Sequence, residues 1–306
     1  MPSYPFHPLR AGRVAACCLA GSLAACAVPS WAQVVQPASV NQQGYSFLLG
    51  FGRLNHQYQE FPSSQPVHSR VRTSTPILST GAVYAVTPEL MFSLASEVTF
   101  FADTATETWT ATSDAFNGRT LTNRVLQTNK ASFSNSDTQV LGHYRLGGEA
   151  FLLGGPSVRT QSFRRHSFAL GADAAVSLPS VATVEESSTE VLMHLGAGLE
   201  TGGVKGHSSH YSLKALIGLP MVRRVENTNH PGVTFNSTRG YDLSLEGRYS
   251  MAVHPGVHLG LWGRWNMARR SAQTQTITDS SGSTTLELPR NEQTSLGYGI
   301  ELLWKL

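Results

Sequence analysis

Hydrophobic and polar residues alternate with a period of two in many segments of this chain. The pattern is clearest at the C-terminus, where Leu296, Tyr298, Ile300, Leu302, Trp304 and Leu306 alternate with Ser295, Gly297, Gly299, Glu301, Leu303 and Lys305. Because successive side chains of a strand point to opposite faces, the first set forms one continuous apolar face. The pattern recurs near residues 45–51, 90–100, 168–178, 191–200, 211–221, 241–251 and 257–267. It predicts an all-β protein whose strands share one environment.

The connections between these segments alternate between short and long. Turn-like connections lie near residues 87–89, 147–149, 202–209 and 254–256, and longer polar ones near 59–66, 112–130, 179–189, 224–235 and 272–290. This order predicts about ten antiparallel strands. Eight or twelve remain open, because residues 150–167 are ambiguous. Thr-rich arms flank turn sequences at 117–118 and 279–283, so we expect strands that extend beyond the common sheet.

The N-terminus has the layout of a secretory signal peptide. Arg10 and Arg13 precede the small and apolar run 14–28, and small residues stand at the −3 and −1 positions before a processing site after Ala32. We expect a signal peptide at 1–32, a flexible lead-in at 33–43 and one barrel domain at 44–306. A lipoprotein cut before Cys26 is the alternative. All three cysteines precede residue 33, so the ordinary cut leaves no thiol chemistry in the mature chain.

Composition excludes nucleic acid as an evident partner. The full chain has 23 basic and 20 acidic residues, and the signal peptide removes two basic ones, so the mature chain has 21 against 20. No basic excess remains to attract nucleic acid. Only 14% of residues are charged, against roughly 25% in soluble domains, while no later segment is apolar for long enough to form a transmembrane helix.

From Gly44 to Leu306 the chain resembles bacterial outer-membrane β-barrel proteins. The resemblance rests on the repeated alternation and on the C-terminal strand with Tyr298, Ile300, Leu302, Trp304 and Leu306, where Leu306 replaces the usual terminal Phe. It implies a monomeric, transmembrane, antiparallel up-and-down barrel with strands extended on the extracellular side. It also implies export to the outer membrane of a Gram-negative bacterium and folding by the barrel-assembly machinery. A soluble periplasmic β-protein is the alternative.

Charged residues fall on the face opposite the apolar one, which is the lumen face in a barrel. We expect a lumen charge network made of Glu97, Arg145, Asp173, Lys214, Asp242, Glu246, Arg248, Arg264 and Glu301. A ten-stranded barrel is narrow, so these side chains either fill it as a plug or form a constriction that selects small solutes. The mixture of both signs favours the plug.

Arginines cluster near the expected outer loops and suggest a lipid partner. The candidates for contacts with lipopolysaccharide phosphates are Arg164, Arg165, Arg223, Arg224, Arg269 and Arg270. Scattered loop charge is the other interpretation of these residues.

In size and expected shape the chain is similar to the omptin proteases, which are also tall ten-stranded barrels. Their chemistry uses paired acidic residues and an Asp/His pair near the outer rim. Here the candidate rim carboxylates Asp103, Asp114, Asp137 and Asp279 are isolated in the sequence, so the catalytic residues do not carry over. His166-Ser167 could form part of an esterase, but adjacent strand residues should point to opposite faces. No cofactor or metal motif is present.

These observations favour a non-catalytic barrel with a structural or surface-interaction role, whose surface or polymer partner is unknown. Two other hypotheses remain: a narrow pore or export accessory channel for small solutes or a secreted polymer, and an outer-membrane enzyme acting on lipid or peptide.

Overall fold

The computed structural model describes residues 45–113, 115–116, 118–172, 178–179, 181–201, 208–279 and 282–305. The expected signal peptide, Cys26, the lead-in, Asp114, Asp173 and Leu306 lie outside the described residues. Within the described residues, no helix is long and apolar enough to cross a membrane.

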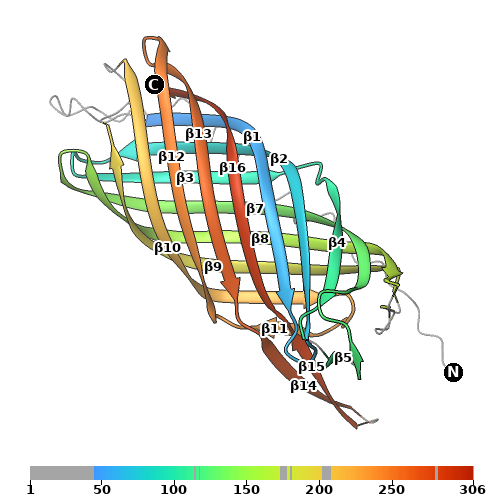
Figure 1. The fold of residues 1–306 in the computed structure, drawn as a ribbon. Coiled ribbons are helices and arrows are strands. Elements are labelled where there is room, and N and C mark those ends of the chain that lie inside the picture. The colour runs from blue at the N-terminus through green and yellow to red at the C-terminus, as the bar shows by residue number, and fades with distance from the viewer. Residues whose placement is uncertain are drawn as a thin grey trace, which may run out of the picture. The chain divides into compact units, whose positions relative to one another are not determined.

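The described chain is built from antiparallel strands (Figure 1). In chain order they are β1 (Tyr45–Phe61), β2 (Val67–Ala85), β3 (Leu90–Thr99), β4 (Thr104–Ala111), β5 (Ala115–Phe116), β6 (Arg119–Thr120), β7 (Val125–Gly147), β8 (Ala150–Leu170), β9 (Thr183–Glu200), β10 (Ser209–Asn227), β11 (Thr234–Asn236), β12 (Gly240–His254), β13 (Val257–Arg270), β14 (Gln273–Asp279), β15 (Gly282–Leu288) and β16 (Arg290–Lys305).

Ten strand positions form a ring. Its order is β1-β16-β13-β12-β10-β9-β8-β7-β3-β2, and β1 also pairs with β2, so the first and last strands of the path are joined. β4 continues β3 and lies between β2 and β7. The all-β, up-and-down order of about ten strands is therefore confirmed. A ring suits a membrane because it leaves no row of unpaired backbone groups facing lipid.

The fifth strand of the ring lies earlier in the chain than the sequence pattern indicates. We expected a strand at 168–178, whereas β8 ends at Leu170 and its strand residues cover the ambiguous region 150–167. The alternation is hidden there because large side chains, Phe151, Leu153 and Phe163, point inward and are buried, while the outer face includes Gly154 and Pro156.

The two ends of the ring differ. At the turn end, short connections join β2 to β3, β7 to β8, and β12 to β13. At the loop end lie the 62–66 connection, the short β5–β6 pair, β11 and the β14–β15 hairpin, which projects from the ring in Figure 1. β1, β7 and β8 have 17, 23 and 21 residues, about twice the 9–11 that cross a bilayer. The strands therefore extend well beyond a membrane-spanning length.

Candidate functional site: the filled bore and the loop end

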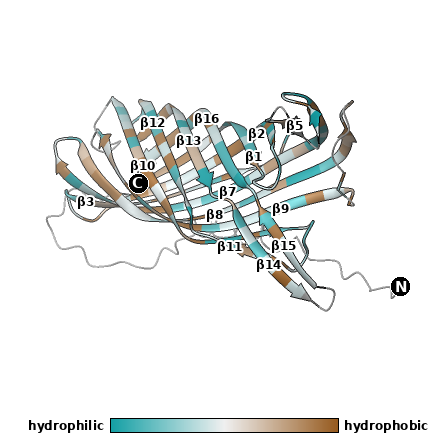
Figure 2. Cartoon of the chain, turned by 60° about the horizontal axis from the view of Figure 1, so that its bottom comes forward, coloured by the Kyte–Doolittle hydropathy of each residue, from teal (hydrophilic) through white to brown (hydrophobic). Residues whose placement is uncertain are grey.

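The outer face of the ring carries a continuous apolar belt near the turn end. Figure 2 shows hydrophobic and hydrophilic residues alternating along the strands. On β16 the outward residues from Leu296 to Trp304 are all apolar or aromatic. Eight residue steps at roughly 3.4 Å, in a strand tilted by about 40°, span about 21 Å along the barrel axis, close to the roughly 25 Å belt of outer-membrane barrels. The belt thus has the height of a bilayer core.

Aromatic side chains mark both edges of this belt. At the turn end, Tyr45 stacks on Tyr84 with ring centroids 4.7 Å apart, and Phe47 stacks on Trp304 at 5.7 Å. At the other edge lie Phe51, Tyr298 and Trp265, all exposed. Aromatic rings favour the boundary between lipid tails and water, so two such rows are expected of a membrane-spanning barrel.

Beyond the belt the outer face becomes polar while the strands continue. On β1 the outward residues change from Leu49 and Phe51 to Arg53, Asn55 and Gln57. On β4 every outward residue is a threonine, and on β7 they are mainly serine and threonine. The loop half of the ring therefore has a surface suited to water.

Inside the belt, the bore contains interlinked ion pairs. Arg248 donates to Glu246 at 2.7 Å and to Glu301 at 2.5 Å, and Lys214 lies 2.9 Å from the same Glu246 carboxylate. These residues come from β10, β12 and β16. Each charge has a partner of opposite sign, which a charge removed from water requires.

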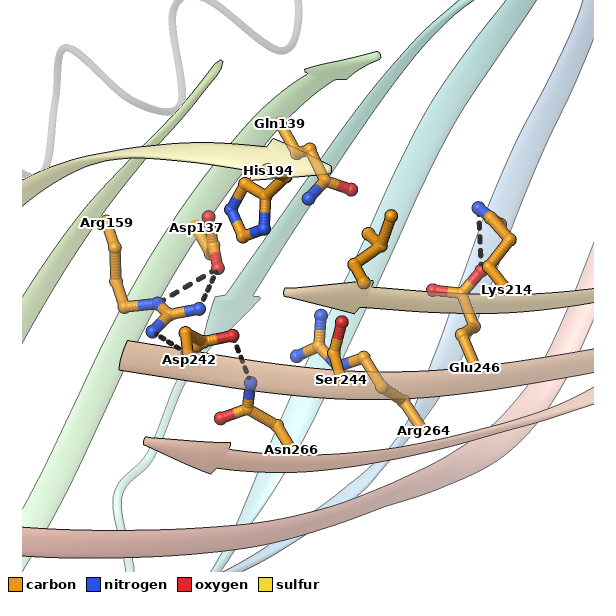
Figure 3. A pocket seen from close by; sticks show the side chains of 11 residues that line it. Asp137, Gln139, Arg159, His194, Lys214, Asp242, Ser244, Glu246, Arg264 and Asn266 are labelled. Carbon is orange, nitrogen blue, oxygen red and sulfur yellow. Dashed lines mark hydrogen bonds and ion pairs between the residues drawn. The ribbon is translucent and has the colours of Figure 1, made fainter. Parts of the chain in front are cut away.

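A second group of ion pairs lies nearer the middle of the bore (Figure 3). The Arg159 guanidinium donates to Asp137 at 2.9 Å and to Asp242 at 2.6 Å, and Asn266 donates to the other Asp242 oxygen at 2.8 Å. Arg264 pairs with Glu97. A cavity of about 30 Å³ remains among these side chains, enough for a water molecule. These ion-paired side chains thus project into the bore and occupy much of it at this level.

An apolar and aromatic layer follows towards the loop end. The His56 ring stacks on Phe133 at 3.7 Å, and Tyr58 stacks on Phe163 at 4.2 Å. This layer is the largest cluster of buried apolar residues that the described chain contains, made of Leu54, Tyr58, Val71, Ile77, Ala131, Phe133, Phe163 and Trp262. Burial and the charge of Arg159 lower the pKa of His56 to about 3, so its imidazole is neutral.

Above the aromatic layer, a further set of buried charges joins the strands. Arg165 contacts Glu60 at 2.8 Å and Glu107 at 2.7 Å, and its guanidinium lies 4.4 Å from the Phe163 ring centroid. Arg270 donates to Glu186 at 2.7 Å. Burial raises the pKa of Glu60, and the charges of Glu186 and Glu107 add to this effect, while Arg165 opposes it. Charged and aromatic layers thus follow one another along this part of the bore.

The residues expected in the lumen network have the following positions. Glu97, Lys214, Asp242, Glu246, Arg248, Arg264 and Glu301 form the ion pairs described above, whereas Asp173 lies outside the described residues. Arg145 lies at the turn end, where it donates to the Gly148 carbonyl at 2.7 Å and its guanidinium lies 4.8 Å from the Phe151 centroid. Sequence reasoning missed Arg159, Glu60, Glu107 and Glu186, although their strand positions share the inward face.

The expected arginine contacts with lipopolysaccharide need a correction. Arg165, Arg223 and Arg270 are buried inside the bore, where Arg223 donates to Glu190 at 2.6 Å, so they do not reach lipid. Their neighbours Arg164, Arg224 and Arg269 point outward. The reason is the alternation itself: of two adjacent strand residues, one faces the bore and the other faces out. Sequence reasoning missed Arg70 and Arg72, which are exposed on β2 and both donate to Gln57.

The expectation that His166 and Ser167 point to opposite faces is also wrong. Ser167 has a φ of 55°, and β8 carries a bulge there opposite residues 128–130 of β7. The local change of direction brings the Ser167 hydroxyl 2.9 Å from His166 Nδ1 at an exposed position. The side chains of neighbouring residues therefore meet, as they do not in regular strand.

Two of the expected rim carboxylates each form an ion pair with a different arginine. Asp103 pairs with Arg53 at 2.8 Å and Asp137 with Arg159 at 2.9 Å. Asp114 and the side chain of Asp279 lie outside what the structure describes. Among the described residues, no group of three or more His, Asp or Glu side chains is placed to hold a metal ion.

Comparison with known proteins identifies the fold. No protein-family model and no curated protein matches the chain. Among solved structures, the outer-membrane protease OmpT from Escherichia coli superposes with a TM-score of 0.63 at 9% identity, covering 89% of this chain and 100% of that one. Neisserial surface protein A (NspA; TM-score 0.28, 12% identity, 83% and 95% covered) and Ail from Yersinia pestis (0.29, 9%, 85% and 99%) match less closely. The chain shares the fold of a small outer-membrane β-barrel.

Proposed function

We propose that this chain is a non-catalytic outer-membrane β-barrel with a closed bore, whose tall polar loop end makes contacts at the cell surface. The apolar belt with its aromatic edges supports insertion in a membrane, and the fold shared with OmpT is consistent with the outer membrane of a Gram-negative bacterium. Export by the N-terminal signal peptide and folding by the barrel-assembly machinery, which would recognise β16, belong to the same proposal.

The observation that carries the proposal is the contrast between bore and loop end. Ion pairs and stacked rings such as His56–Phe133 occupy the interior, which supports a bore without a continuous route for solutes. The strands nevertheless extend beyond the belt and end in the β14–β15 hairpin. Glu287 fastens this hairpin to the 62–66 connection by accepting bonds from Ser63 N at 2.5 Å, Ser63 Oγ at 2.7 Å and Ser64 N at 3.1 Å. A polar loop end whose hairpin and neighbouring connection are joined in this way suits a surface contact.

Lipopolysaccharide remains the proposed lipid partner, through a revised set of arginines. Arg224 forms an ion pair with Glu226 at 2.6 Å, and Arg269 lies 3.7 Å from Glu292. Arg164, Arg70 and Arg72 are exposed outside the belt and form no ion pair with a carboxylate in the described part of the chain. Their guanidinium groups are available to bind lipid phosphates.

Surface exposure is tested by labelling intact cells with a membrane-impermeant maleimide. Ser283→Cys places a thiol on the β14–β15 hairpin, and Glu89→Cys places one in the β2–β3 turn; both positions are exposed. The proposal expects the hairpin thiol to react in intact cells and the turn thiol to react only after lysis. The reverse result would place the loop end in the periplasm and overturn the surface role.

One observation favours a second candidate, an enzyme acting on lipid esters. A serine hydroxyl bonded to a histidine is the arrangement of an activated nucleophile, and Ser167 lies at an exposed bulge beside His166. The test is hydrolysis of a p-nitrophenyl ester and of lipid A vesicles by the wild type and by Ser167→Ala, with Ser162→Ala as the control on the same strand. Turnover lost only in Ser167→Ala would establish this candidate, and absence of turnover in the wild type would exclude it for these esters.

A further inference from the structure

The third strand of the ring is interrupted by an insertion of two residues. Between Val98 and Thr104 the chain advances six positions, while its partner β7 advances only four, from Ser136 to Ser132. On the other side, β3 and β4 advance nine positions from Thr99 to Thr108, and β2 advances seven from Ile77 to Arg70. The registers with β7 and with β2 therefore both show two extra residues between β3 and β4. Extra residues in a strand must bulge out of the sheet.

The bulge presents an aromatic residue outward. Phe101 is 85% exposed, the largest exposed fraction of any large hydrophobic side chain among the described residues. Its φ is 51°, a left-handed conformation that is costly for a residue with a bulky side chain. Its ring meets that of Phe100 edge-on with centroids 5.6 Å apart. A strained backbone that exposes a phenylalanine is unfavourable in water, so a different environment for this side chain is indicated.

The position of the bulge along the barrel axis identifies that environment. The Phe100 and Phe51 ring centroids lie 5.8 Å apart, and Phe51 is the last apolar outward residue of β1 before the polar run of Arg53, Asn55 and Gln57. The next outward residue, Arg53, forms an ion pair with Asp103 just past the bulge at 2.8 Å. Phe101 therefore lies between the apolar belt on one side and a charged pair on the other, at the level where lipid tails meet headgroups.

We propose that the bulge at Phe100 and Phe101 is a lipid anchor, in which the Phe101 ring inserts among outer-leaflet lipids at the boundary between tails and headgroups and fixes the depth of the barrel there. The proposal rests on the membrane location proposed above. Arg53 and Asp103 remain in the headgroup layer and prevent deeper insertion. On β7 and β8 the apolar belt ends at Val140 and Val158, which are followed towards the loop end by threonines and not by an aromatic bulge. The anchor therefore acts on one side of the ring.

The test measures the depth of a spin label in lipid vesicles. The full chain carries Cys17→Ser, Cys18→Ser and Cys26→Ser, and single labels are placed by Phe101→Cys, Phe92→Cys and Thr106→Cys. Phe92 is an exposed belt residue of β3, and Thr106 is an exposed residue further along β4. Collision with oxygen reports lipid, whereas collision with a water-soluble nickel chelate reports water. Ala102→Cys provides a second label in the bulge should the Phe101 variant fold poorly.

We expect the Phe101 and Phe92 labels to collide more with oxygen, and the Thr106 label to collide more with nickel. A Phe101 or Ala102 label that behaves like Thr106, while Phe92 reports lipid, would overturn the anchor and leave the membrane barrel intact. A Phe92 label that also reports water would instead overturn the membrane location. The two failures are therefore distinguishable.

Discussion

Arg159 on β8 donates to Asp242 on β12 across the bore, with 2.6 Å between Nη1 and Oδ2. Two strands, β9 and β10, separate β8 from β12 in the ring, so this pair connects walls that share no backbone hydrogen bonds. The same guanidinium also pairs with Asp137 on β7. One side chain thus holds two carboxylates and links three strands through the interior.

Replacement of Arg159 by alanine should strongly destabilise the barrel. The change leaves Asp137 and Asp242 buried without their cation, which costs about 3–5 kcal/mol in measured cases. Urea unfolding in lipid vesicles, followed by tryptophan fluorescence, gives the loss in free energy of unfolding. Arg269→Ala is the matched control, because Arg269 is partly exposed and its pairing should contribute about 0–1 kcal/mol. Equal effects of the two variants would contradict the role given to the interior pair.

His56 should make the barrel sensitive to acid. Burial and the charge of Arg159 lower its pKa to about 3 from an ordinary value of 6.5. The unfolded state therefore binds the proton more readily, so the contribution to stability is complete above pH 6.5 and is lost as the pH falls towards 3. Between these two pKa values, each pH unit below 6.5 lowers the free energy of unfolding by about 1.4 kcal/mol. The loss at pH 5 is therefore about 2 kcal/mol.

The measurement is the free energy of unfolding between pH 7 and pH 5 for the wild type and for His56→Gln. The variant loses stacking on Phe133 and so starts less stable, but its stability should change less over this range. An unchanged slope in His56→Gln would show that this imidazole is not the acid-sensitive group.

Glu287 should hold the β14–β15 hairpin at neutral pH and release it in acid. The bonds that its carboxylate accepts from Ser63 and Ser64 lower its pKa below the ordinary value of 4.5. The contact is thus fully formed above pH 4.5 and weakens as the pH falls through the lowered value. The rate of hydrogen exchange at the Ser63 and Ser64 amides reports whether their bonds to Glu287 are formed. We expect faster exchange in Glu287→Gln at pH 7, and no change in a Glu226→Gln control.

Closure of the ring between β1 and β16 should depend on two glycines that face each other. Gly52 pairs with Gly299, and a Cβ on Gly299 would overlap the backbone of Phe51, while one on Gly52 would overlap the backbone of Tyr298. Gly299→Ala should therefore reduce the folded fraction seen as a heat-modifiable shift on gels, at a cost of about 1–3 kcal/mol or more. Gly263→Ala on β13 has room, with its nearest neighbour 4.0 Å away, and should fold normally.

Much of the fold could be predicted because the two faces of each strand meet such different surroundings. Residues such as Ile300 and Leu302 alternate with Gly299 and Glu301 strictly enough to predict that β16 is a strand and which of its faces points outward. The strand at 150–170 was missed because Phe151 and Phe163 are large and apolar on the inward face, which removes the contrast on which the prediction depends.

The interior contacts could be predicted only in part. Alternation places Arg269 outward and Arg270 inward, since Trp265 and Met267 of the same strand face out. It fails for Arg223 and Arg224, because a bulge between Pro220 and Val222 reverses which residues face the bore. Which carboxylate each arginine meets depends on the registers of several strands at once. A pair such as Arg159 and Asp242, 83 residues apart, leaves no trace in local sequence.

Single-channel recording in planar bilayers tests the closed bore most directly. The full chain is inserted after its heat-modifiable gel shift shows that it is folded, and current is recorded for the wild type and for Glu246→Gln. The ion pairs and stacked rings of the interior predict a folded protein that conducts no steady current. A steady conductance whose ion selectivity changes in Glu246→Gln would contradict this account and make the protein a pore.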